Sequence, residues 1–374
     1  MVESNNARPI PQIRLEVPDY VAIPGTHKWL HLKGHIAYGR FTDDKWQEHF
    51  TSIGNPYTID VLYHSKSLFA KVGNKEHFPV EFEGGIQMSA QFGGDQYIAG
   101  QKEPVIDMPT RFVDFMRVLV PMAGDDTTTP EGEQVNIYGN HVGSWNFAAT
   151  AYLNRWKVKI YYEHYFDDHS QMFFQYGRWK DGHIGLEITF PKNRFIDTFV
   201  YEGLGTKDQT GPMLYDSFWG EFEEQISAKD NYYNHYLYQG WQHWGMGIGN
   251  PLLPGPIYNK NGQITFISNR VLAHHIGFCG SPCQSLSYRM LLSYSRHWGT
   301  YDNPLNEIKK QFNSLFEVTY APQQLKGWSF TVSGAMDRGS ILGNNYGGML
   351  VIRKQGIIKS GNKSVSYTHL RAHE

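Results

Sequence analysis

Residues 141–166 read HVGSWNFAATAYLNRWKVKIYYEHYF and contain two runs of alternating residues on either side of Asn154 and Arg155. A period of two places successive side chains on opposite faces of an extended chain, so each run predicts a β-strand. The Asn-Arg junction predicts a tight hairpin between them. The apolar set is Trp145, Phe147, Ala149, Ala151 and Leu153 in the first run, and Val158, Ile160 and Tyr162 in the second.

The same alternation recurs along most of the chain and predicts about fourteen strands joined mostly by short turns. Many are longer than the roughly 5–6 residues usual in soluble sheets and suit the 9–11 or so that a tilted membrane crossing needs. The face opposite the apolar one carries Lys, Glu, Gln, Ser, Arg and Thr, as expected of a wet interior. The predicted strands are residues 8–24, 28–42, 57–72, 78–93, 141–154, 157–166, 183–190, 195–202, 263–268, 271–278, 285–295, 314–321, 328–337 and 345–357.

One segment breaks this rhythm. Between Met108 and Met122 the apolar residues Phe112, Phe115, Met116 and Leu119 fall at helical spacing, which predicts a short helix. Residues 125–133 are polar and predict a loop.

Two all-β architectures fit this pattern. A soluble sandwich also has strands with one polar and one apolar face. Aromatic residues near the strand ends are typical of the girdles of membrane barrels and favour the second architecture. We therefore expect an antiparallel transmembrane outer-membrane β-barrel over residues 8–357, with one short helical segment. The aromatic residues concerned are Trp145, Tyr165, Phe166, Tyr294, Trp298 and Trp328.

Composition narrows the function. The 374 residues are 19% charged and 15% aromatic, with a net charge of −2, so no nucleic-acid partner is expected. No apolar run approaches the roughly 20 residues of a membrane-spanning helix. The first residues lack the apolar core of a signal peptide, and residues 364–374 resemble translated adapter sequence. We expect that tail to be non-native and the barrel domain to be incomplete in this chain.

Residues 232–256, YYNHYLYQGWQHWGMGIGNPLLPGP, combine aromatic rings with amides and alternating glycines. Rings can stack on sugar faces while amides bind hydroxyls, so the stretch is a candidate ligand-binding segment. The alternative is that these rings pack the lumen or form an interfacial girdle. The candidate binding residues are Tyr238, Gln239, Trp241, Gln242, His243, Trp244 and Asn250.

Cys279 and Cys283 are the only cysteines, and their proximity in an oxidising exterior suggests a disulfide. His274 and His275 are adjacent within a predicted strand, so they point to opposite faces and no shared metal site is expected. The sequence contains none of the common hydrolase, metalloprotease, P-loop or dinucleotide motifs. We therefore expect neither catalysis nor a cofactor.

Three stretches together carry a family resemblance: residues 141–172, residues 182–213 (GHIGLEITFPKNRFIDTFVYEGLGTKDQTGPM) and residues 238–258 (YQGWQHWGMGIGNPLLPGPIY). They resemble the Wzi-type capsule assembly proteins of Gram-negative outer membranes, in their Bacteroidetes branch, over about residues 10–357. The chain departs from that family by lacking a signal peptide and by ending early.

The resemblance implies an outer-membrane barrel of about eighteen strands with a small periplasmic helical part. It also implies a lectin-like, non-catalytic monomer that holds capsular or other surface polysaccharide and contacts outer-membrane lipids. A porin-like channel and a glycan-active enzyme remain the alternative functions.

Overall fold

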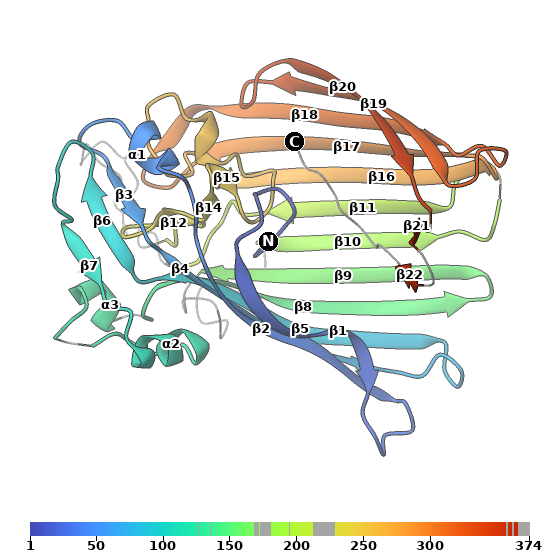
Figure 1. Ribbon diagram of the computed structural model, residues 1–374, viewed down its shortest axis with the longest axis horizontal. Coiled ribbons are helices and arrows are strands. Elements are labelled where there is room, and N and C mark those ends of the chain that lie inside the picture. Colours follow the sequence, from blue (N-terminus) through green and yellow to red (C-terminus); the bar gives the residue numbers. More distant parts are fainter. Residues whose placement is uncertain are drawn as a thin grey trace.

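The computed structural model describes residues 1–125, 127–135, 137–167, 172, 181–193, 195–211, 229–356, 358–360 and 363–365. Its centre is one antiparallel sheet of 13 strands in which each strand pairs with its neighbours in chain order (Figure 1). The strands are β1 (Gln12–Ala22), β2 (Leu30–Arg40), β4 (Leu62–Val72), β5 (Val80–Phe92), β8 (Asn140–Leu153), β9 (Trp156–Asp167), β10 (Gly182–Thr189), β11 (Thr198–Gly205), β16 (Val271–Cys283), β17 (Leu286–Gly299), β18 (Pro304–Tyr320), β19 (Trp328–Gly339) and β20 (Asn345–Lys354).

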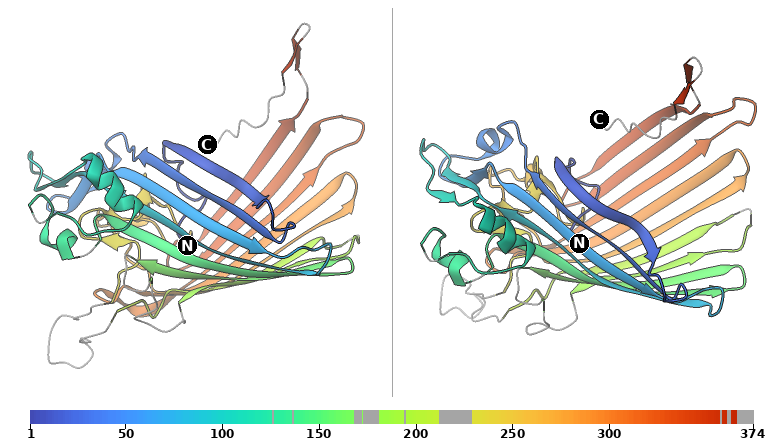
Figure 2. Two further views of the ribbon diagram at one scale, coloured as in Figure 1. Left: turned by 90° about the horizontal axis from the view of Figure 1, so that it is seen from below. Right: turned by 60° about the horizontal axis from the view of Figure 1, so that its bottom comes forward.

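The sheet is strongly curved, and β1 and β20 form its two margins (Figure 2). Within the part of the chain that the structure describes, each of these two strands has a hydrogen-bonded neighbour on one side only. The expected all-β antiparallel architecture is confirmed, and the described sheet is open between β1 and β20.

The observed strands follow the alternation of the sequence closely. The hairpin between β8 and β9 pairs Leu153 with Trp156, and Asn154 adopts the left-handed backbone (φ 57°) that such tight turns require. Two predicted strands differ. The predicted strand 57–72 is divided into β3 (Pro56–Ile59), which belongs to a small separate sheet, and β4. The predicted strand 263–268 is not part of any sheet. Its backbone is bound by side chains instead: Asn259 donates to the carbonyls of Gln263 and Thr265, both at 2.7 Å.

Most smaller elements gather at one end of the sheet, around the described residues of 41–61, 93–139 and 229–270, which we call the packed end (Figure 1). The opposite end has short connections, such as 154–155 and 284–285. The small elements are α1 (Trp46–Phe50), β3 (Pro56–Ile59), β6 (Gly94–Ile98), β7 (Ile106–Met108), α2 (Phe112–Leu119), α3 (Glu131–Val135), β12 (Asn234–His235), β13 (Gln239–Gly240), β14 (Gln242–His243), β15 (Met246–Gly247) and a 3-10 turn, η2 (Pro256–Tyr258); a separate ladder, β21 (Ile358–Ser360) and β22 (Lys363–Val365), follows β20.

The helical expectation holds in part. Helix α2 lies within the segment whose spacing predicts it. Helices α1 and α3 were not expected, and α3 occupies part of the predicted loop 125–133. Both are single turns, too short to leave a helical period in the sequence. Among the described residues, no helix has the length and apolar character needed to span a bilayer.

The two faces of the sheet differ in chemistry. One, the outer face, exposes a large apolar side chain on nearly every strand. The pairing of the strands places these side chains near one another on adjacent strands. The other, the inner face, carries mostly charged and polar side chains. The outer set includes Leu15, Ile36, Leu68, Phe82, Phe147, Ile160, Ile184, Ile276, Tyr294, Phe316, Val332 and Leu350; the inner set includes Glu83, Asn146, Lys159, Glu163, His183, Glu202, His275, Ser293 and Asn313.

Toward the packed end the inner face becomes apolar and supports a core. Inward side chains of the sheet there contact buried residues of 232–266. Two aromatic residues expected in an interfacial girdle, Tyr165 and Phe166, are fully buried. Tyr165 packs edge-on against the rings of Tyr232 and Tyr233, at 4.7 and 5.6 Å between centroids, so it is a core residue.

Candidate functional site

The aromatic stretch 232–256 folds into a compact plug on the inner face at the packed end. Trp241 is fully buried, and its indole N–H donates to the carbonyl of Val2 at 2.8 Å. Tyr233 is also buried, and its hydroxyl accepts the backbone N–H of Asn250 at 3.0 Å. The sequence left core packing open as the alternative for this stretch, and the structure shows that packing.

Glycines allow the plug to be this tight. A Cβ at Gly249 would collide with the hydroxyl of Tyr233 and the carbonyl of Met1. Gly245 has φ +77°, in the left-handed region that only glycine adopts easily, and it lies against Trp46 and Ile257. The alternating glycines of the sequence therefore reflect close packing within the plug.

The seven predicted binding residues are dispersed over the plug. Tyr238, Gln239, Trp241, Gln242 and His243 are buried, and only Trp244 and Asn250 are partly exposed. Gln239 borders a cavity of about 730 Å³. Gln242, His243 and Trp244 border another of about 550 Å³. Asn250 borders a third, on the inner face. The seven residues thus form no single surface, and the enclosed ring of Trp241 has no face open for stacking.

Two cavities on the inner face adjoin at His183. The larger, of about 390 Å³, lies over β1, β2, β4, β5, β8, β9 and β10. The smaller, of about 280 Å³, lies between β10, β11, β16 and β17 and reaches Asn250 of the plug. Their lining residues are Tyr20, Lys33, Phe69, Glu83, Asn146, Phe147, Ala148, Lys159, Tyr161, Tyr162, Glu163, His183 and Glu187 in the first, and His183, Glu202, Leu204, Asn250, Pro251, Leu252, Ala273, His275 and Ser293 in the second.

His183 lies between two carboxylates on neighbouring strands. Its Nδ1 is 3.7 Å from Glu163 Oε2, and its Nε2 is 3.4 Å from Glu202 Oε1. Tyr161 also donates its hydroxyl proton to Glu202. On the far side of Glu202, His275 shares a 2.7 Å hydrogen bond with the hydroxyl of Ser293. Imidazole, phenol and carboxylate groups therefore run across β9, β10, β11, β16 and β17.

Ion pairs continue this polar surface toward β5. Lys159 Nζ is 3.5 Å from Glu83 Oε1, and Lys157 Nζ is 3.5 Å from Glu187 Oε1. The hydroxyl of Tyr20 donates to Glu83 at 3.1 Å. Each of these groups retains lone pairs or protons that could bind hydroxyl groups of a ligand.

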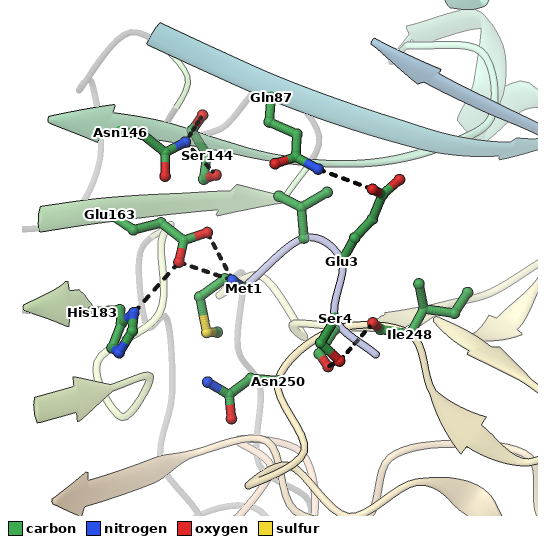
Figure 3. A network of polar contacts seen from close by, with 12 residues as sticks. Met1, Glu3, Ser4, Gln87, Ser144, Asn146, Glu163, His183, Ile248 and Asn250 are labelled. Carbon is green, nitrogen blue, oxygen red and sulfur yellow. Dashed lines mark hydrogen bonds and ion pairs between the residues drawn. The ribbon is translucent and has the colours of Figure 1, made fainter. Parts of the chain in front are cut away.

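The N-terminal segment lies against the same surface (Figure 3). The nitrogen of Met1 is 2.7 and 2.8 Å from the two oxygens of Glu163, and Gln87 donates to Glu3 at 3.1 Å. Ser4 donates to the carbonyl of Gly249 at 2.6 Å. These contacts tie the plug to the inner face of β5 and β9.

Alternation alone predicts which residues of a strand face inward. It does not predict which residues of the adjacent strands lie beside them. The register sets His183 opposite Glu163, and Glu187 opposite Lys159. A sequence gives little information on register between strands joined by long connections, such as the one between β9 and β10. The grouping around His183 was therefore missed.

Two residue pairs considered from the sequence can be placed. His274 contacts Tyr201 on the outer face, while His275 lies on the inner face, as expected. Cys279 and Cys283 are free thiols on β16, contrary to the disulfide expectation. Four steps along an extended strand span about 13 Å, beyond the roughly 7 Å that a disulfide can bridge. Among the described residues, no group of three or more His, Cys, Asp or Glu side chains is placed to hold a metal ion.

Outside the large sheet, burial raises the pKa of several acidic groups, among them Asp181 and Glu133. Asp181, just before β10, is buried and accepts hydrogen bonds from the amides of Asp208 and Gln209. Burial raises the pKa of Asp181 to about 6. Burial likewise raises the pKa of Glu133, which accepts hydrogen bonds from Gly139 and Tyr236.

No protein-family model and no curated protein sequence matches this chain. A solved structure does: the chain is similar to Wzi of Escherichia coli, an outer-membrane protein involved in group 1 capsule assembly and described as a carbohydrate-binding β-barrel. The TM-score is 0.52 and the identity 11%. The match covers 94% of this chain but 63% of the Wzi chain, so this chain spans less than two thirds of that structure. What the two share is the fold, a mostly β architecture built on one large antiparallel sheet.

Proposed function

We propose that the curved sheet is the wall of an outer-membrane β-barrel, and that the protein binds capsular or other surface polysaccharide on its inner face without cleaving it. The observation that carries the proposal is the polar array centred on His183, which borders two adjoining cavities. The likeness to Wzi, a carbohydrate-binding barrel, supports the class of ligand.

The outer face supports placement in a membrane. Its exposed apolar side chains extend from β1 to β20, for example Leu15 at 81% and Leu350 at 64% exposure. A soluble monomer rarely exposes an apolar surface of this extent. In outer-membrane barrels the short turns are periplasmic and the long loops extracellular. By that rule the packed end faces the cell exterior, which differs from the periplasmic helical part implied by the family resemblance.

The inner face suits a hydroxyl-rich ligand. Sugars are bound by aromatic faces together with carboxylates, amides and amines that pair with hydroxyls. The larger cavity supplies Tyr20, Phe69 and Tyr161 as rings, with Glu83, Asn146 and Lys159 as polar groups. A porin-like channel is less well supported, because the plug and the N-terminal segment pack against the inner face.

The proposal is tested by glycan binding to a charge-neutral pair of variants. Lys159→Gln with Glu187→Gln removes one cation and one anion from the larger cavity. Since hydrogen bonds to charged groups contribute about 1.5–3 kcal/mol, we expect roughly tenfold or greater loss of affinity for surface polysaccharide from the source cells. The matched control is Lys102→Gln with Glu103→Gln, two exposed positions of the packed end. Affinity is measured in detergent by surface plasmon resonance.

Equal affinities of the two double variants and the unmodified protein would contradict binding on the inner face. The same glycan samples, incubated with the protein and assayed for new reducing ends, test the absence of cleavage. Release that depends on the protein would contradict a purely binding role and favour the enzyme alternative.

A further inference from the structure

Helix α2 packs Phe115, Val118 and the charged Asp114 against the protein and leaves a second set of apolar side chains facing away from it. Phe112, Val113 and Val120 are 78%, 43% and 59% exposed, whereas Asp114 and Val118 are fully buried. Surface helices of water-soluble domains instead carry polar residues on the side that faces away from the core. The exposed apolar side chains of α2 therefore favour an apolar environment outside the described chain.

The charges on the buried side are paired with each other. Asp114 lies 2.7 Å from Arg117 and 3.3 Å from Arg111, and both arginines reach Asp125, at 3.5 and 3.6 Å. A buried carboxylate is tolerated when it is paired and hydrogen-bonded in this way. The orientation of α2 is thus fixed by specific contacts.

Helix α2 packs on the outer face of the sheet, beside β2 and β4. The hydroxyl of Tyr38 donates to the carbonyl of Phe115 at 2.8 Å, and the two rings are 5.4 Å apart. Lys66 donates to the carbonyls of Val118 and Leu119 at 2.7 and 2.6 Å. These carbonyls lie in the last turn of the helix, where they have no partner within the helix itself. His64, Lys66, Leu68 and Val72 all point outward from β4. Helix α2 covers the part of the strand at His64 and Lys66, whereas Leu68 and Val72 are exposed.

We propose that α2 lies in the water–lipid boundary of the bilayer, with Phe112, Val113, Met116 and Val120 in contact with lipid. The exposed apolar side chains of α2 extend the apolar outer face past His64 and Lys66, the polar outward residues of β4. Amphipathic helices in this position bury their apolar side at the boundary between headgroups and acyl chains. This inference rests on the proposed membrane embedding of the outer face.

Four matched Val→Cys variants test the inference, each in a Cys279→Ser, Cys283→Ser background and labelled with a bimane fluorophore in liposomes. Val113→Cys and Val120→Cys report on α2. Val332→Cys, 60% exposed on β19, is the reference for the outer face, and Val105→Cys, 46% exposed in a loop of the packed end, is the reference for water. Quenching is measured with lipids bearing a doxyl group near the headgroup and with aqueous iodide.

We expect the two α2 labels and the Val332 label to be quenched by doxyl lipid at least twofold more than the Val105 label, and by iodide at least twofold less. If doxyl lipid quenches the Val332 label but both α2 labels behave like the Val105 label, the inference is overturned. The membrane proposal then remains intact. If Val332 also behaves like Val105, both are overturned. If the unlabelled α2 cysteines form disulfide-linked dimers and their labels are shielded from both quenchers, a second copy covers the helix, and the inference is again overturned.

Discussion

Trp241 and Trp244 are close in the chain and have different environments. Trp241 is enclosed by the plug and near Tyr63, with 6.2 Å between ring centroids. Trp244 is partly exposed, and the guanidinium of Arg8 lies 4.3 Å from its ring centroid. The sequence could not separate them, because both belong to one glycine-rich aromatic segment without a clear period.

The two tryptophans should therefore respond differently to truncation. Trp241→Ala leaves a cavity and an unpaired carbonyl at Val2, and we expect a loss of roughly 3–5 kcal/mol in unfolding free energy. Trp244→Ala removes mainly the contact with Arg8, for which about 0.5–1 kcal/mol is expected. Denaturant unfolding in detergent measures both. A stable Trp244→Ala protein that no longer binds glycan would show that this ring contacts the ligand; equal destabilisation by both changes would contradict the packing described here.

Asp181 gives a pH dependence with a defined sign. Its pKa is raised from 3.8 to about 6 in the folded protein, so the folded state binds more protons than the unfolded state between these values. Stability from this group is therefore present at about pH 4 and falls as the pH rises through 6, by on the order of 2–3 kcal/mol. In Asp181→Asn, the loss of unfolding free energy between about pH 4 and 6 should be smaller by about this amount.

The measurement is the unfolding midpoint in detergent at several pH values between 4 and 7. Asp44→Asn, an exposed aspartate of the packed end, is the control and should follow the unmodified protein. Identical pH profiles for Asp181→Asn and the unmodified protein would refute the assignment to Asp181.

At the scale of single elements, β17 tests the opposed faces most directly. Leu292 pairs with Ile276 on the outer face, whereas Ser293 contacts His275 beside an inner cavity. If the outer face lies in the bilayer as proposed, Leu292→Arg places a cation in the lipid and should cost about 2–4 kcal/mol near the midplane. Ser293→Arg faces the wet interior, so folding should tolerate it. Folding into detergent or lipid is read by heat-modifiable migration on gels, and equal tolerance of the two changes would favour a soluble sheet.

The sequence was most informative where a strand has two unlike faces. Alternation located the members of the large sheet because each strand places one side toward an apolar and one toward a polar environment. It failed at 263–268, where Ile264 and Phe266 are buried but asparagine side chains, such as Asn259, replace a neighbouring strand. It identified α2 by its spacing, but periodicity alone does not say that Phe112, Val113 and Val120 point away from the protein.

At the scale of the whole molecule, the candidate site depends on pairings that no local pattern specifies. Glu163, His183 and Glu202 belong to three neighbouring strands, β9, β10 and β11. The composition of the inner face could be predicted from the alternation, but the contacts between these groups could not. The sequence placed ligand binding in residues 232–256, the part of the chain with the most rings, and most of those rings are enclosed in the plug.

The pairing of each strand with its neighbours in chain order has a consequence for how the molecule folds. In such an order the sheet can grow one hairpin at a time, and each added strand closes a comparatively short loop. The plug is different, because its contacts join residues near 240 to Val2 and Tyr63, and these must wait for most of the chain. Growth of the wall should thus precede docking of the plug, and slow folding phases should report on the aromatic core and not on strand pairing.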